Sequence, residues 1–238
     1  MGKRVLAFVH EDDAGPGVFT EAVAQRGAEL IEWFVPRDPA PSDALDGYDG
    51  AVVLGGAMHP DGEADHPWLR DEKRLIGDLL QRDVPVLGVC LGAELVAEVT
   101  GGRAVENPAP HIGWAESSLT QEGRDDPVLG ALPPSFHCFQ WHSYSCEIPT
   151  EGTRLAVEDS QLDAFRVGDA WGIQFHAEVD PEIIDGWLRL LETHQDAKDA
   201  GFELGPGREE TARRIDESGD VGRTLFAAFL DQLEPRKR

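Results

Sequence analysis

The first hundred residues alternate between short apolar runs and longer stretches in which apolar and polar positions are mixed. The apolar run 4–10 has the length of a buried strand. The segment 18–35 has the pattern of an amphipathic helix that ends near Gly27 and leads into a second strand. Further buried strands are predicted at 50–54, which runs into a Gly-Gly turn, and at 84–89.

Two more helices follow the later strands. One is predicted over 66–83, where apolar residues recur at three- and four-residue spacing, and the other over 91–102, where glycines close it. The polar, proline-rich segment 36–49 is predicted to be a loop. Strands that alternate with helices in this way indicate a mostly parallel central sheet with helices on both faces.

The pattern changes after residue 103. From there to about residue 176 the chain reads as short strands and turns, which predicts antiparallel hairpins added to the edge of the sheet. A helix is predicted over 180–194, with Asp180 as its cap and Pro181 at its first position. Residues 197–235 predict two further helices, separated by the glycine-rich stretch GFELGPG.

Length and composition fit a globular protein. The chain has 238 residues, which suits one large domain or one domain with an appendage, and 41% of them are hydrophobic. No apolar run approaches the roughly 20 residues that span a bilayer. Residues 1–13 lack a long apolar stretch and a small-residue cleavage site, so we expect neither a signal peptide nor a membrane partner.

The charge is strongly negative. The formal net charge is −24, from 45 acidic and 21 basic residues, and this repels phosphate backbones, so we expect no nucleic-acid partner. An acidic, lysine-poor composition occurs in halophile proteins, and the Arg-over-Lys usage of a GC-rich genome is similar, so both origins stay open. Three cysteines argue against a disulfide framework and predict a reducing, cytoplasmic location.

Cys90 lies where a predicted strand meets a predicted helix, with Gly88 and Gly92 two residues to either side. Small residues at these positions let the chain turn sharply, as in a nucleophile elbow with sulfur in place of the serine oxygen. The following helix N-terminus favours a thiolate, and its free N–H groups can bind an oxyanion. The alternative is a small buried cysteine at the end of a strand.

A base and an orienting acid are available further along. If 170–179 is a strand, Gln174, His176 and Glu178 share one face, so Glu178 is placed to fix the imidazole tautomer of His176. The motif H-x-E is common, and a surface His-Glu pair is the alternative. The turn at Gly55–Gly56 can aim a backbone N–H at an oxyanion, or it can simply end its strand.

Two other clusters have weaker interpretations. The residues His137, Cys138, His142 and Cys146 are metal-binding types, but on a strand the first two face opposite ways and no C-x-x-C occurs. The acidic run 11–13 is better explained as a solvated loop than as a metal site. Neither glycine pair fits a phosphate-binding motif, so we expect no nucleotide, metal or cofactor.

These motifs occur in a specific order. GVCLG follows one strand, Gly-Gly follows an earlier strand, and GIQFHAE lies far downstream. The combination resembles the class I (triad) glutamine amidotransferases, and above all the stand-alone proteins similar to the glutaminase domain of GMP synthase. The segments HIGW and FQWHSYS also resemble that subgroup. The likeness runs from residue 4 to about residue 190.

The resemblance implies a flavodoxin-like α/β sandwich, with residues 1–195 as the amidotransferase domain and 196–238 as a helical extension packed on it. It implies that Cys90 attacks the γ-amide carbon of glutamine and forms a glutamyl thioester. His176 would act as base and acid, with Glu178 orienting it. The N–H groups of Gly56 and Leu91 would form the oxyanion hole. The substrate pocket would contain Glu94, His142, Ser143 and Tyr144.

Three positions depart from the family pattern. Ala57 and Ala177 stand where proline is usual, which changes backbone stiffness and leaves the chemistry possible. Glu94 stands where glutamine is usual, four residues after the nucleophile and one helical turn along the same face. We expect Glu94 to reach toward the substrate. The alternative is that it pairs with an arginine such as Arg103 and never meets the substrate.

The resemblance predicts release of ammonia from glutamine, with the ammonia acceptor, if there is one, on a separate synthetase chain. One rival is a γ-glutamyl peptidase or amide hydrolase that uses the same triad. Another is a catalytically silent regulatory or binding subunit, against which the intact Cys90, His176 and Glu178 argue. A cysteine hydrolase of the intracellular-protease type would place His directly after the nucleophile, where this chain has Leu91.

Overall fold

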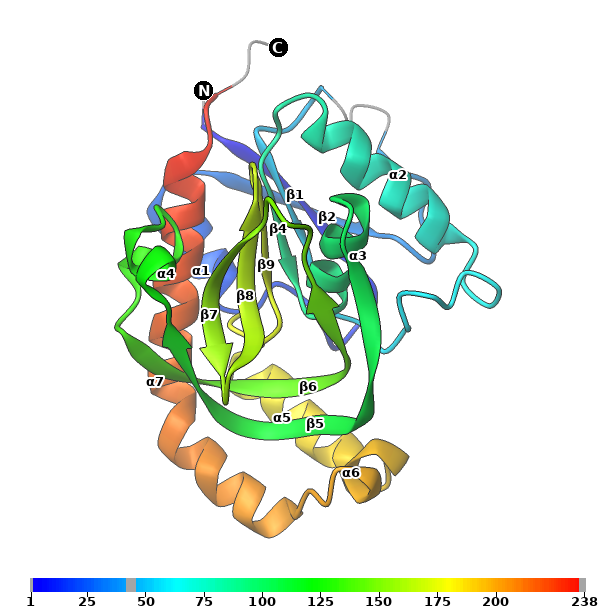
Figure 1. The fold of residues 1–238 in the computed structure, drawn as a ribbon, viewed down its shortest axis with the longest axis vertical. Coiled ribbons are helices and arrows are strands. Elements are labelled where there is room, and N and C mark those ends of the chain that lie inside the picture. Colours follow the sequence, from blue (N-terminus) through cyan, green and yellow to red (C-terminus); the bar gives the residue numbers. More distant parts are fainter. Residues whose placement is uncertain (1, 42–45, 236–238) are drawn as a thin grey trace.

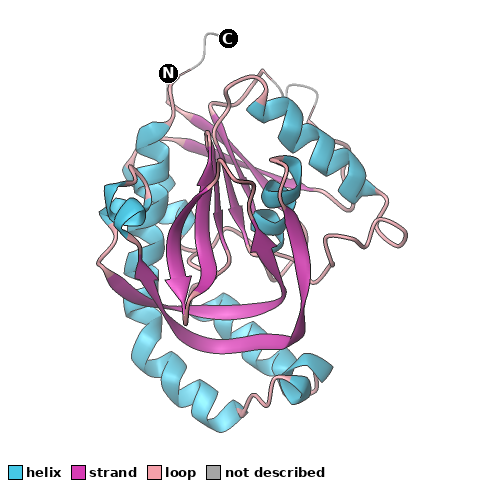
Figure 2. Cartoon of the chain, in the orientation of Figure 1, coloured by secondary structure: helices cyan, strands magenta, loops and turns pink. Residues whose placement is uncertain are grey.

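A nine-stranded sheet runs through the computed structural model, which describes residues 2–41 and 46–235 (Figures 1 and 2). The strand order is β2-β1-β3-β4-β9-β8-β7-β5-β6. The strands are β1 (Arg4–Val9), β2 (Glu29–Phe34), β3 (Gly50–Val53), β4 (Val86–Val89), β5 (Arg103–Leu119), β6 (Ser135–Glu147), β7 (Thr153–Glu158), β8 (Gln161–Val167) and β9 (Ala170–Ile173).

The sheet has a parallel half and an antiparallel half. Strands β2, β1, β3, β4 and β9 pair in parallel, whereas the pairs β9–β8, β8–β7, β7–β5 and β5–β6 are antiparallel. The parallel strands β3, β4 and β9 are buried along their whole length, as strands covered on both faces are. The predicted α/β class, with antiparallel strands added at one edge, is therefore confirmed.

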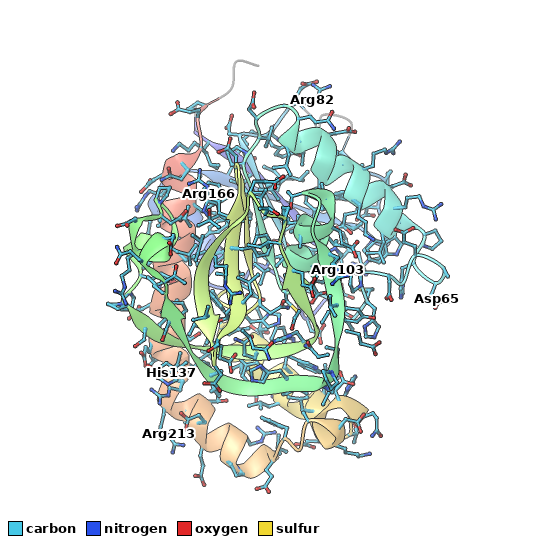
Figure 3. All side chains as sticks on the ribbon, viewed as in Figure 1. Asp65, Arg82, Arg103, His137, Arg166 and Arg213 are labelled. Carbon is cyan, nitrogen blue, oxygen red and sulfur yellow. The ribbon has the colours of Figure 1, made fainter. Side chains whose placement is uncertain are left out.

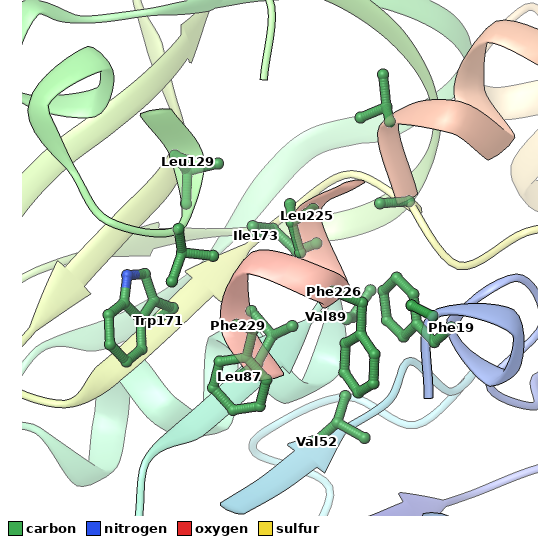
Figure 4. Close-up of a cluster of buried hydrophobic side chains, with 14 of the residues drawn as sticks. Phe19, Val52, Leu87, Val89, Leu129, Trp171, Ile173, Leu225, Phe226 and Phe229 are labelled. Carbon is green, nitrogen blue, oxygen red and sulfur yellow. The ribbon is translucent and has the colours of Figure 1, made fainter. Parts of the chain in front are cut away.

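Helices cover both faces. They are α1 (Phe19–Gln25), α2 (Trp68–Leu80), α3 (Leu91–Val99), α4 (Gln121–Asp125), α5 (Pro181–Leu191), α6 (Gln195–Asp199) and α7 (Leu204–Gln232), with a short 3-10 turn at Leu129–Ala131. Helices α1 and α7 share one hydrophobic cluster with the sheet, and α2 and α3 share another on the opposite face. In Figure 4, Phe226 and Phe229 of α7 lie with Val52 and Leu87 of the parallel strands.

A third cluster is separate from these two. It packs α5 and α6 against the long β5–β6 hairpin, through residues such as Trp187 and Phe139. Figure 1 shows both helices beside that hairpin, away from α2. Asp180 caps α5 by accepting from the N–H groups of Glu182 and Ile183, and Pro181 is its first residue, as predicted. This arrangement brings α5 and α6 to the carboxyl end of β9.

Several boundaries differ from the sequence prediction. The strand expected over 170–179 ends at Ile173, and His176 then forms an isolated bridge to Phe139. Strands β5 and β6 are long, with 17 and 13 residues, and not the short strands expected. Helix α7 begins inside the glycine-rich stretch, because Pro206 falls in its first turn, where a missing N–H breaks no intrahelical bond.

Two predictions cannot be compared in full with the structure. Part of the loop expected over 36–49 falls on residues 42–45, which lie outside the described residues. The division into residues 1–195 and 196–238 also stays a prediction. Within the described chain, α7 shares its apolar face with α1 and the parallel strands, and Phe19 stacks on Phe226 with ring centroids 4.4 Å apart.

Candidate active site

Cys90 occupies a strained turn between β4 and α3. Its backbone has φ +50° and ψ −112°, a conformation that L-residues seldom adopt. A Cβ on Gly88 would lie 2.3 Å from the carbonyl oxygen of Gly92, and one on Gly92 would lie 2.0 Å from that of Val53. Only glycine fits at both positions. The turn therefore has the geometry of a nucleophile elbow, as the G-x-C-x-G spacing predicts.

His176 and Glu178 meet Cys90 at the same edge of the sheet. The Nδ1 of His176 lies 2.7 Å from Oε1 of Glu178, and both side chains are buried. The imidazole and the Cys90 thiol lie close enough that each shifts the pKa of the other. These residues follow β9 and β4, which are parallel neighbours, so their carboxyl ends place the three side chains together. The surface His-Glu pair considered as an alternative is wrong.

The electrostatics of this cluster are coupled. Burial raises the pKa of the Cys90 thiol, while the neighbouring His176 opposes that rise. Burial alone would lower the pKa of His176, but the carboxylate of Glu178 and the contact with Cys90 outweigh it and raise the pKa above its ordinary value. A base with a raised pKa beside a thiol is suited to accept the thiol proton.

The Gly55–Gly56 turn is held on one side by His10. Nδ1 of His10 donates to the carbonyl oxygen of Gly55 at 3.0 Å, and Nε2 lies 2.8 Å from Oε1 of Glu72. All of His10 and Glu72 is buried. In a trans peptide the carbonyl and the next N–H point to opposite sides of the chain. The N–H of Gly56 therefore points away from His10. No motif in the sequence indicated that His10 and Glu72 would hold this turn.

A cavity of about 340 Å³ opens beside Cys90. Every site residue predicted from the sequence lines it except Glu178, which lies behind His176. The predicted residues that line it are Cys90, His176, Gly56, Leu91, Glu94, His142, Ser143 and Tyr144. Leu91 is the first residue of α3, where backbone N–H groups have no partner inside the helix. The topology thus brings residues from four segments to one concave site.

Glu94 faces this cavity. The residue is 3% exposed, and its carboxyl accepts a hydrogen bond from Nε2 of Gln174 at 3.1 Å. Burial raises its pKa to about 7, and the Gln174 hydrogen bond opposes that rise. Arg103 instead pairs with Glu147, so the alternative in which Arg103 neutralises Glu94 is wrong. Gln174 is a residue for which the sequence offered no role.

The His142–Tyr144 segment of β6 forms another wall. Nδ1 of His142 donates to the carbonyl oxygen of Tyr144 at 2.7 Å, and burial lowers the pKa of His142 to about 4. The Tyr144 hydroxyl donates to Oδ1 of Asp61 at 3.1 Å, and burial together with Asp61 raises its pKa to about 12. Both side chains are therefore neutral at neutral pH.

A further part of the cavity lining was not foreseen from the sequence. It consists of Trp141, Trp187, His194 and Asp196, with Asp13 beside them. The ring of Trp187 packs against His176 with centroids 4.7 Å apart, and the thiol of Cys90 lies 3.5 Å from the carbonyl oxygen of Trp141. The run 11–13 is a loop, as expected, but Glu11 and Asp13 face the cavity.

The other two cysteines lie in the core. Cys138 lies 3.7 Å from the Ser218 hydroxyl, Cys146 lies 3.6 Å from Oε1 of Gln174, and burial raises the pKa of both thiols. His137, labelled in Figure 3, lies on β6 and does not line the cavity beside Cys90. Among the described residues, no group of three His, Cys, Asp or Glu side chains is placed to hold a metal ion. Nor does any described helix have the length and apolarity to cross a bilayer.

Comparison with known sequences identifies the family to which the chain belongs. The family model "Glutamine amidotransferase class-I" matches residues 17–186. The chain is 33% identical over 167 residues to a subunit of the glutamine-hydrolyzing GMP synthase of Haloarcula marismortui, covering 66% of this chain and 81% of that protein. It is 26% identical over 191 residues to the glutamine amidotransferase-like protein YfeJ of Salmonella typhimurium, covering 78% of this chain and 80% of that protein. It spans about a third (35%) of the longer GMP synthase of Aeropyrum pernix.

Solved structures share the fold. A glutamine amidotransferase from Thermotoga maritima superposes with a TM-score of 0.86 at 24% identity, covering 98% of this chain and all of that one. A glutamine amido transferase from Methylobacillus flagellatus superposes with a TM-score of 0.87 at 23% identity, covering 100% of this chain and 98% of that one. Both superpositions extend through the C-terminal helices, beyond the segment that the family model matches.

Proposed function

Because the chain belongs to the class I glutamine amidotransferase family, we propose that it hydrolyses the γ-amide of glutamine, and that Cys90 is the nucleophile. The observation that carries the proposal is the convergence of Cys90, His176 and Glu178 in one buried cluster at the cavity wall. A silent binding protein would have no need to keep a strained, positive-φ cysteine beside a hydrogen-bonded His-Glu pair.

In the first step, His176 takes the thiol proton and the Cys90 sulfur attacks the γ-carbonyl carbon. The carbonyl oxygen becomes an oxyanion, and the N–H groups of Gly56 and Leu91 are the donors placed to receive it. His176 then gives its proton to the amide nitrogen, the carbon–nitrogen bond breaks, and ammonia leaves. Cys90 is left as a glutamyl thioester.

In the second step, water takes the place of ammonia. His176 removes a proton from this water, which attacks the thioester carbon through a second oxyanion in the same hole. The carbon–sulfur bond breaks, His176 returns the proton to sulfur, and glutamate leaves. Glu178 keeps the proton of His176 on Nδ1, so that Nε2 faces the reaction throughout.

The destination of the ammonia is also a proposal. The Haloarcula relative is named as a subunit of GMP synthase, which suggests an acceptor enzyme on a separate chain. A second candidate function, hydrolysis of a substituted γ-glutamyl amide, is favoured by one observation. Glu94, where the family usually has glutamine, faces the cavity and introduces a carboxyl group there.

The test of the proposal is to trap the thioester. The intact protein is mixed with glutamine, quenched in acid within the first turnovers, and analysed by mass spectrometry with peptide mapping. We expect a glutamyl adduct on the peptide that contains Cys90, accompanied by release of ammonia. Free ammonia without any adduct on Cys90 would point to a different nucleophile, and a protein that releases neither ammonia nor glutamate from any γ-glutamyl amide would overturn the proposal.

A further inference from the structure

The cavity beside Cys90 is acidic. Four carboxyl side chains line it, and none of its described lining residues is lysine or arginine. The four are Glu11, Asp13, Glu94 and Asp196. Glu11 is engaged, because it accepts the N–H of Ala57 at 3.0 Å, and Glu94 is held by Gln174. A cavity with this charge attracts a cationic ligand and disfavours an anionic one.

The two remaining carboxylates lie on one side of the reaction centre. In the proposed mechanism the leaving nitrogen takes its proton from His176, so the amine portion of a substrate departs past that ring. Trp187 packs on His176, and its Nε1 donates to the carbonyl oxygen of Asp13 at 3.0 Å. We therefore assign Asp13 and Asp196, which line the cavity with Trp187, to the amine side. Glu94, which comes from α3, is assigned to the side where the glutamyl portion would bind.

Aromatic rings connect His176 to these carboxylates. Trp187 meets Trp141 edge to face with centroids 5.8 Å apart, and Trp141 meets His194 at 5.5 Å. Nε1 of Trp141 lies 3.4 Å from Oδ2 of Asp196. Tryptophan rings and carboxylates that line one cavity are a combination suited to ammonium groups, through cation–π attraction and charge.

Asp13 is not neutralised by the rest of the protein. In the described parts of the chain no ion pair includes its carboxylate, whereas the neighbouring Asp12 pairs with Arg37. Asp196 contacts only His194 and Trp141 through its side chain in those parts of the chain. Among the described residues neither carboxylate pairs with a lysine or an arginine, so both retain charge for a cation that enters the cavity.

We propose that this wall, formed by Asp13, Trp141, Trp187 and Asp196, binds the amine portion of a γ-glutamyl amide whose amine carries a second, cationic group, as in a γ-glutamyl diamine. The inference rests on the proposed function, because it needs the same thioester chemistry. Cys90 breaks the amide bond, His176 protonates the released nitrogen, and the diamine leaves. Water then hydrolyses the glutamyl thioester, so the products are glutamate and a diamine.

The experiment compares four substrates with the full-length protein at one fixed ionic strength, because salt screens these charges. They are glutamine, γ-glutamylputrescine, its neutral isostere γ-glutamylpentylamine, and the anionic γ-glutamyl-γ-aminobutyrate. Glutamate release gives kcat/KM for each. We expect the cationic conjugate to exceed the neutral one by roughly tenfold, as for one favourable charged contact, and the anionic one to be the poorest.

The variants Asp13→Asn and Asp196→Asn then test the wall directly. Each should lower the ratio of cationic to neutral kcat/KM, and the double variant should bring it close to one. Asp12→Asn and Asp199→Asn are matched controls, because they remove the same charge from the same loop and the same helix without lining the cavity. They should leave the ratio unchanged.

The outcomes separate the inference from the proposed function. If none of the four substrates is hydrolysed, the proposed function itself fails. If glutamine and the conjugates are hydrolysed with no preference for the cationic conjugate, the proposed function stands and this wall does not bind the amine portion. The same conclusion follows if the preference survives in the double variant. A preference for the anionic conjugate would also overturn the inference.

Discussion

The side-chain amide of Gln174 donates to Oε1 of Glu94 at 3.1 Å, in the wall of the cavity that contains Cys90. The other end of the same amide is fixed, because its oxygen lies 3.6 Å from the Cys146 sulfur. Gln174 therefore presents its NH₂ group, and not its oxygen, to Glu94. The chain thus holds a carboxyl at a position where related proteins usually have an amide, and it supplies a donor for that carboxyl.

The first prediction concerns this carboxyl and the binding of glutamine. An ionised Glu94 can only accept hydrogen bonds, so it repels a substrate carboxylate placed near it. We expect Glu94→Gln to lower KM for glutamine, with a change of roughly 1–3 kcal/mol. Steady-state ammonia release measures it. Glu98→Gln, on the same helix but paired with Lys73, is the control, and an equal KM in wild type and Glu94→Gln would show that Glu94 does not contact the substrate.

The second prediction concerns pH and stability. The folded-state pKa of Glu94 is about 7, above its ordinary value of 4.5, so the folded protein binds a proton that the unfolded chain releases between these pH values. Folding stability contributed by this group therefore falls as pH rises from 4.5 to about 7, and then stays constant.

Glu94→Gln removes that dependence. We expect the difference in the free energy of unfolding, variant minus wild type, to increase by on the order of 3 kcal/mol as pH rises from 4.5 to about 7. Above that pH the difference should stay constant. Urea unfolding at constant salt, in steps of pH, measures the difference. Other buried carboxyls such as Asp163 titrate equally in both proteins and cancel. A difference that does not change with pH would contradict the raised pKa.

The third prediction concerns the support of the oxyanion hole. His10 holds the carbonyl of Gly55, and Glu11 holds the N–H of Ala57, so the Gly-Gly turn is fixed at both ends. Loss of the His10 contact should lower kcat by roughly tenfold to a hundredfold with little change in KM, because in the proposed mechanism the Gly56 N–H acts on the transition state.

The variant for this test is His10→Phe combined with Glu72→Leu, so that no carboxylate stays buried without its partner. Near-ultraviolet circular dichroism establishes that it is folded, and Glu72→Gln alone, which keeps a hydrogen-bonding group opposite His10, should lose much less activity. An unchanged kcat in the folded double variant would mean that the turn holds its orientation without His10.

The fourth prediction concerns salt. The net charge is −24, and several arginines already have acidic partners: Arg103 pairs with Glu147, Arg166 with Asp126, and Arg213 with Glu210. Figure 3 labels these three arginines. The excess negative charge repels itself, and salt screens that repulsion within a Debye length that falls from about 30 Å at 0.01 M to about 3 Å at 1 M. We expect Tm to rise across this range of potassium chloride. A neutral osmolyte of equal osmolality should raise it less, and a flat or falling Tm in chloride would remove the case for salt adaptation.

The sequence indicated the reaction centre because its signals are local. The glycines at 88 and 92 mark the elbow, and H-x-E at 176–178 marks the proposed base and its partner. The parallel pairing places the carboxyl ends of β3, β4 and β9 side by side. The residues that follow these strands therefore lie close together.

The rest of the site depends on contacts that no local pattern encodes. The wall proposed to bind the amine forms because α5 and α6 pack on the β5–β6 hairpin. This packing brings Trp187 of α5 against His176 and adds Asp196 of α6 to the cavity lining. His10 and Glu72 are 62 residues apart, and their pairing follows from how α2 packs over the end of β1. The early end of β9 at Ile173 was missed for a similar reason, since the bridge of His176 to Phe139 is a long-range contact.

The central claim is that Cys90 is the nucleophile, and the most direct measurement is glutamate release from glutamine by purified Cys90→Ala beside wild type and Cys138→Ser. Loss of a triad nucleophile lowers kcat by many orders of magnitude, so we predict no turnover above background in Cys90→Ala and near wild-type rates in Cys138→Ser, whose sulfur lies in the core. A folded Cys90→Ala protein that keeps more than a few per cent of wild-type activity would contradict the account.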